Sequence, residues 1–83
     1  MDLIVFNSNQ VSKDILNRFV YKNVVVLNIK IKPLHSHVMI NNHIWPVQIS
    51  NYVPEGKIYL NSTQRKLYKL AYNDIIKVIL TNI

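Results

Sequence analysis

Arg65, Lys66 and Lys69 form the one local cluster of positive charge in the sequence. An arginine presents a planar fork that fits a carboxylate, and a lysine adds a compact point charge. If these residues share one turn of a helix and face solvent, they form a candidate docking patch for an acidic protein surface. A solvated helix face with ordinary charges is the plainer interpretation. Lys13 and Arg18 could widen the patch from an earlier helix.

The histidines and acids are weaker candidates for a functional site. His35, His37 and His43 include a His-x-His pair, which a strand would place on one face. The chain has no cysteine and no carboxylate that completes a ligand set, so we expect surface or loop histidines. The acids form no recognisable catalytic pair, and one glycine cannot build a phosphate-binding loop. We therefore expect no enzyme, no metal and no cofactor. The four acids are Asp2, Asp14, Glu55 and Asp74.

Aromatic side chains are interleaved with basic ones, a pattern that suits stacking on single-stranded nucleic acid. Packing in the core or in turns is the expected role of Trp45 and of most tyrosines. Tyr59 alternates with Ile58 and Leu60, so it is the best candidate for an exposed aromatic. A small basic nucleic-acid-binding barrel is therefore one alternative function. A structural homo-oligomer is another, because so short and apolar a chain can leave a patch to bury.

Length and composition predict a single domain that spans residues 1–83. The chain is 49% hydrophobic and carries a net charge of +6, which favours an anionic partner. The absence of cysteine is compatible with the cytoplasm. No apolar run approaches the roughly 20 residues that span a bilayer, so we expect no membrane insertion. The segment from Met1 to Phe6 is too short and begins too acidic for a signal peptide.

Strand patterns dominate the chain. Asn41-Asn42 predicts a two-residue turn, Pro54 and Gly56 predict a tight turn, and Pro33 ends a strand. Asn61 or Ser62 can cap the second of two short helices. The predicted strands cover residues 3–6, 24–31, 37–40, 43–49, 58–60 and 74–80, and the predicted helices cover residues 12–19 and 62–70.

The two ends of the sequence resemble each other. Residues 4–10 (IVFNSNQ) parallel residues 58–64 (IYLNSTQ), and residues 21–25 parallel residues 72–76 after a slip of three positions. Each copy reads as strand, short helix and strand, which suggests duplication of one unit. Two such units predict a mainly β fold, a six-stranded double-psi β-barrel with two short helices. An OB-like or SH3-like barrel is the alternative.

The order of Pro54, Gly56, Ile58, Gln64-Arg65-Lys66 and the last strand resembles the first N-terminal subdomain of the NSF (N-ethylmaleimide-sensitive fusion) family of AAA ATPases. The likeness extends more weakly through residues 37–49. It implies a double-psi barrel that recognises adaptors or substrates in vesicle trafficking. It places Arg65 and Lys66 beside a groove for the acidic SNAP adaptor, and helical spacing adds Lys69. The chain is then either a piece of such an ATPase or a free-standing barrel, of cellular or viral origin.

Overall fold

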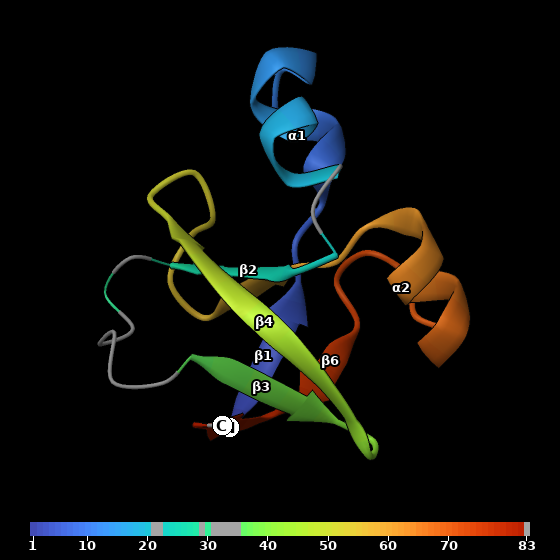
Figure 1. The fold of residues 1–83 in the computed structure, drawn as a ribbon. Helices are drawn as coiled ribbons and strands as arrows, with labels where there is room; N and C mark the ends of the chain where they lie inside the picture. The colour runs from blue at the N-terminus through green and yellow to red at the C-terminus, as the bar shows by residue number, and fades with distance from the viewer. Residues whose placement is uncertain (21–22, 29, 31–35, 83) are drawn as a thin grey trace.

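The computed structural model describes residues 1–20, 23–28, 30 and 36–82. Within these residues, seven strands form a nearly closed barrel with two α-helices and one 3-10 helix (Figure 1). The strands are β1 (Asp2–Val5), β2 (Val25–Asn28), β3 (His37–Ile40), β4 (His43–Ser50), β5 (Lys57–Tyr59), β6 (Ile75–Lys77) and β7 (Ile79–Thr81). The helices are η1 (Ser8–Gln10), α1 (Lys13–Val20) and α2 (Ser62–Tyr68).

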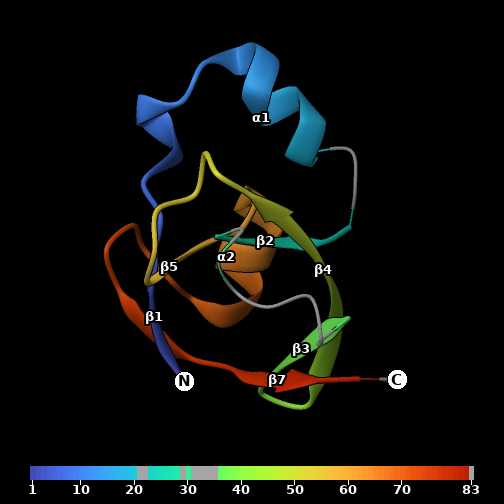
Figure 2. The same ribbon diagram turned by 90° about the vertical axis from the view of Figure 1, so that its left-hand side faces the viewer.

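The strands follow the order β6-β1-β5-β2-β4-β3-β7, with β1/β5 and β2/β4 parallel and the other pairs antiparallel. The described residues thus contain seven strands, not the six predicted. The predicted strand at residues 74–80 divides at Val78, whose N–H and carbonyl both bond to Met1. Beyond Val78 the chain pairs with β3 instead of β1. One stretch of chain therefore runs from β1 to β3 and brings the barrel close to closure (Figure 2).

The two similar segments of the sequence interlock in space. Their first strands, β1 and β5, lie side by side and parallel. β1 is antiparallel to β6, and β5 is antiparallel to β2. Each first strand therefore pairs with the last strand of the other segment. β2 and β6 are thus each held in the sheet by a strand of the other segment.

Asparagines begin the corresponding helices of the two segments. Asn7 accepts a hydrogen bond from the Asn9 N–H and begins η1. Asn61 accepts one from the Gln64 N–H, and the Gln64 side chain accepts one from the Asn61 N–H, which makes a capping box for α2. The first segment differs because α1 follows η1, where the sequence predicted a single helix.

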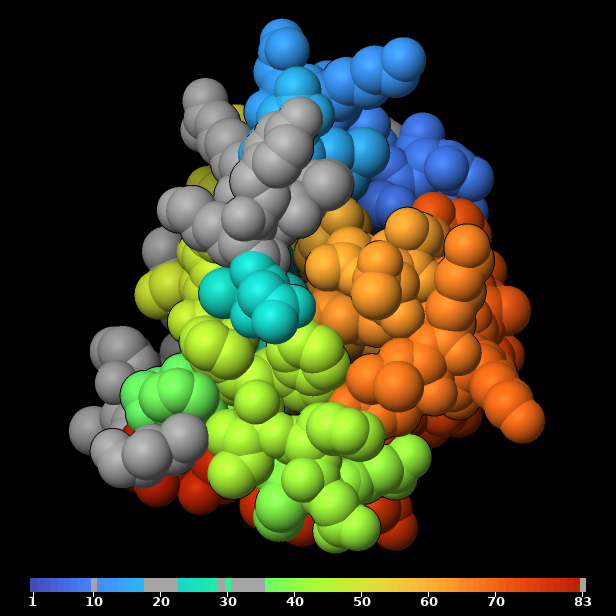
Figure 3. Space-filling model, turned by 45° about the vertical axis from the view of Figure 1, so that its right-hand side comes forward, coloured from blue at the N-terminus to red at the C-terminus, as the bar shows by residue number. Residues whose placement is uncertain are grey.

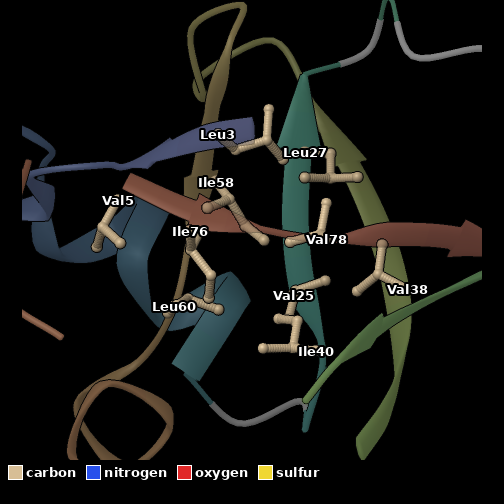
Figure 4. Packing of buried hydrophobic residues seen from close by; sticks show 10 residues of the cluster. All are labelled: Leu3, Val5, Val25, Leu27, Val38, Ile40, Ile58, Leu60, Ile76 and Val78. Atoms are coloured by element: carbon tan, nitrogen blue, oxygen red, sulfur yellow. The ribbon is translucent and has the colours of Figure 1, made fainter. Parts of the chain in front are cut away.

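Alternating side chains fill the barrel interior. β1, β3 and β6 each turn every second residue inward, which is the half-buried pattern that periodicity predicts. Figure 4 shows these side chains converging, and they come from β1, β2, β3, β5, β6 and the residues that follow β5 and β6. The interior cluster consists of Leu3, Val5, Val25, Leu27, Val38, Ile40, Ile58, Leu60, Ile76 and Val78.

A second apolar cluster lies on the outer face of β2 and β5. Phe6, Val26, Val53 and Tyr59 are buried there, and α1 contributes partly buried side chains against them. All four residues of β2 are buried for this reason. The prediction that Tyr59 is exposed is wrong, since Tyr59 is only 3% exposed. Alternation does turn Tyr59 away from the barrel interior, but a helix covers the face it reaches.

The predicted turns are confirmed where the structure describes them. Asn41 and Asn42 both have positive φ, at 48° and 69°, as a tight hairpin turn requires. Gly56 has φ of 77°. The helix predicted to reach residue 70 ends at Tyr68, because Lys69 adopts φ of 56° and closes it. The predicted end of a strand at Pro33 lies outside the described residues.

Candidate functional site

The helix α2 is fixed to the barrel from both ends. At its start, the buried Gln64 side chain donates to the Val24 carbonyl at 3.0 Å, in addition to its capping bond with Asn61. At its end, the Tyr68 hydroxyl donates to the Ile40 carbonyl at 3.2 Å and accepts from the Trp45 indole at 2.7 Å. The side chains on the outer face of α2 therefore project from a helix that hydrogen bonds hold to the barrel at both ends.

Arg65 is half-buried and lies against the barrel. Its Nη1 donates to the Leu60 carbonyl at 2.6 Å. Its guanidinium carbon lies 4.5 Å from the centre of the Tyr72 ring, an arrangement that attracts the cation to the ring face. The Tyr72 hydroxyl in turn bonds with the Ser8 hydroxyl at 3.0 Å. The Leu60 carbonyl and the Tyr72 ring engage part of the fork, and the role of Arg65 in binding a partner stays a prediction.

The Arg65 guanidinium also acts on the neighbouring Tyr59. Burial raises the pKa of the Tyr59 phenol above its ordinary value of 10.0, and the charge of Arg65 opposes this shift by favouring the phenolate. Arg65 thus joins β5, α2 and the segment that carries Tyr72. We interpret it as a structural residue that holds α2 in place.

Lys66 and Lys69 are exposed, as the sequence predicted. Across the part of the chain that the structure describes, the one ion pair joins Lys30 to Glu55 at 2.8 Å, so neither Lys66 nor Lys69 is paired there. The Glu55 carboxylate raises the pKa of Lys30 through its hydrogen bond and its charge. Lys66 and Lys69 flank Leu67, whose side chain is 50% exposed. We call Lys66, Leu67 and Lys69 the α2 basic surface.

Two effects unrelated to partner binding account for part of the placement of Lys66 and Lys69. Positive charge near the carboxyl end of a helix is favourable, because the last carbonyls point outward there. Lys69 also serves as the C-cap, and its N–H bonds to the carbonyls of Arg65 and Lys66. Neither effect neutralises the two ammonium groups, so both stay available to an anionic partner.

The β3–β4 hairpin borders the α2 basic surface. Figure 3 shows α2 and residues of this hairpin side by side on one face of the molecule. The centres of the His43 and Tyr68 rings lie 5.9 Å apart with their planes at 71°, and Ile44 next to His43 is 50% exposed. Sequence reasoning did not predict that the β3–β4 hairpin lies beside α2, since no local pattern links Trp45 to Tyr68. The only hint was that each ring carries a polar group that needs a partner when half-buried.

The other predicted residues lie elsewhere. Lys13 is exposed on α1, which Figures 1 and 2 show at one end of the barrel, away from α2. The side chain of Arg18 and the whole of His35 fall outside the described structure. His37 bonds with the Ser36 hydroxyl at 2.6 Å. Asp74 accepts from the Ala71 N–H at 2.8 Å in the turn before β6.

The described residues contain no candidate metal site and no membrane-spanning helix. Among the described residues, no three histidine or acidic side chains group in a way that could hold a metal ion. The described helices are also too short and too polar to cross a membrane. No protein-family model matches the chain, and a search of curated proteins finds no significant relative.

Proposed function

We propose that this barrel is a non-catalytic protein-binding module that takes an acidic partner on the α2 basic surface. The observation that carries the proposal is the exposure of Lys66 and Lys69, without an ion pair among the described residues, on a helix anchored at both ends. Leu67 gives the same surface an apolar contact. The partner that fits is a protein segment with carboxylates on either side of an apolar side chain.

The expected strength of this contact is modest. An exposed ion pair contributes about 0.2–1 kcal/mol, so two such pairs give a weak and salt-sensitive attraction. Covering Leu67 adds an apolar term that salt does not screen. The combination favours a partner that is held reversibly, as an adaptor would be.

The proposal extends to the family that the sequence resembles. The element order after Pro54 and the interlocking of the two similar segments support a double-psi barrel of the NSF N-domain kind. In that setting the partner is a SNAP-like adaptor in the cytoplasm, and Lys66 carries the role that the resemblance assigns to the Arg65-Lys66 pair. Arg65 then acts by positioning α2.

Charge reversal at single lysines tests the proposal. Fluorescence anisotropy would follow a labelled peptide in which glutamates flank leucine. We expect Lys66→Glu and Lys69→Glu each to weaken binding about fivefold, which corresponds to about 1 kcal/mol. Lys13→Glu is the matched control, because it makes the same charge change on the exposed surface of α1. We expect this control to bind as the parent chain does.

Two results would contradict the proposal. Equal weakening by all three reversals would mean that the peptide responds only to net charge. Tighter binding of a single-stranded oligothymidine, with a steep dependence on salt, would favour the nucleic-acid alternative. The burial of Tyr59 has removed the aromatic on which that alternative chiefly depended. Circular dichroism of each variant would confirm that the fold is retained.

A further inference from the structure

The outer face of β1 and β6 exposes apolar side chains that the described structure leaves uncovered. Ile75 is 69% exposed and Ile4 is 38% exposed. The two are direct neighbours across the antiparallel pair, because Ile4 is opposite Ile75 in the register. They therefore form one continuous apolar contact rather than two isolated residues. On β5 and β2, by contrast, α1 covers the outer face.

A pair of opposite charges completes this face. Asp2 and Lys77 are the next outward-facing pair along the same two strands, and both are exposed. No ion pair joins them among the described residues. Asp2 is one of only four acidic residues in a chain of net charge +6. We define Asp2, Ile4, Ile75 and Lys77 as the β1–β6 face.

The β1–β6 face is complementary to itself. A twofold axis along the strands, midway between β1 and β6, lays each strand over the other strand of a second copy. Ile75 then meets Ile4 of the second copy, and Lys77 meets its Asp2. Such an interface uses the same surface on both molecules, which is the commonest symmetry of homo-oligomers. An acidic partner would gain Lys77 but be repelled by Asp2, whereas a second copy matches both charges of this face.

We propose that the β1–β6 face joins two copies of this chain in a weak, twofold homodimer. Beyond Lys77, Ile79 begins a second row, Ile79–Met39–Ile44, that is paired across β7, β3 and β4. Ile79 is 55% exposed and Ile44 is 50% exposed. A face of four residues is small beside the roughly 800 Å² per partner of a standard interface, so we expect the dimer only at high concentration.

Sedimentation velocity over a range from low-micromolar to near-millimolar chain tests this proposal. We expect the parent chain to shift from one to two copies across that range. Ile75→Lys removes the main apolar contact and should leave the chain monomeric. Because Ile75 is largely exposed, this change should leave unfolding by urea almost unaffected, which distinguishes a lost interface from a lost fold.

A charge swap gives the sharper control. Asp2→Lys and Lys77→Asp should each weaken association about tenfold, because each places like charges opposite one another. The double variant Asp2→Lys/Lys77→Asp restores opposite charges across the twofold axis and should recover the parent association. A parent chain that stays single at every concentration would overturn the proposal. So would a double variant no better than its two single variants.

Discussion

Arg65 provides the strongest test of the structure, because its two contacts predict a role in stability. In Arg65→Met the apolar stem is largely kept, while the bond to the Leu60 carbonyl and the contact with the Tyr72 ring are lost. A hydrogen bond from a charged donor contributes about 1.5–3 kcal/mol. A cation over an aromatic ring adds about 0.5–2 kcal/mol. Since Arg65 is half-buried, we expect the low end of each range and a total loss of about 2–3 kcal/mol.

That loss is large for this chain. Domains of this length unfold with roughly 0.05–0.15 kcal/mol per residue, so Arg65→Met would remove a substantial share of the stability. A midpoint decrease of about 4–8 °C per kcal/mol makes the effect easy to measure. Lys66→Met is the matched control on the same turn, and we expect it to stay within about 0.5 kcal/mol of the parent.

Urea unfolding followed by Trp45 fluorescence is the suitable assay. Trp45 is the single tryptophan and bonds directly to Tyr68 of α2, so its emission reports on the end of the helix that Arg65 supports. Equal unfolding midpoints for Arg65→Met and the parent chain would refute the structural role. A larger loss for Lys66→Met than for Arg65→Met would refute it as well, because the order of the two residues would be reversed.

Two further predictions concern Tyr59 and Gly56. Burial raises the pKa of folded Tyr59 above 10.0, so its contribution to stability is complete below about pH 10 and is lost as pH rises through the raised value. Urea titrations between pH 8 and 11 should therefore show a steeper decline for the parent than for Tyr59→Phe, and parallel curves would contradict this. Gly56→Ala should cost about 1–2 kcal/mol, because φ is 77° and an added Cβ meets nothing within 4 Å, which leaves only backbone strain. Thermal melts would measure this, and an unchanged midpoint would mean that the turn adopts another conformation.

Local patterns predicted the features that local forces determine. The hairpin at Asn41-Asn42 and the helix cap at Asn61 depend on residues within a few positions, and both are present. The strands from Leu3, Val38 and Ile58 follow from alternation and from β-branched side chains. The overall β character of the fold follows from these elements.

Non-local contacts account for the errors. Alternation correctly turned Tyr59 outward, but nothing in its own segment reveals that α1 covers that face. The division of the last strand depends on Met1, which lies at the other end of the sequence. Each of these outcomes requires knowing which distant segments meet.

The strand path through Val78 also bears on when the barrel can assemble. β7 bonds to β3, and β6 to β1, so the sheet cannot approach closure before residues 75–81 are present. Such pairings between distant parts of the chain are slow to form, because loop entropy is lost before the contacts reward it. Until residues 75–81 pair with them, β1 and β3 each keep an unpaired edge. Residues 75–81 therefore complete the sheet, and deletions within them should leave an aggregation-prone chain.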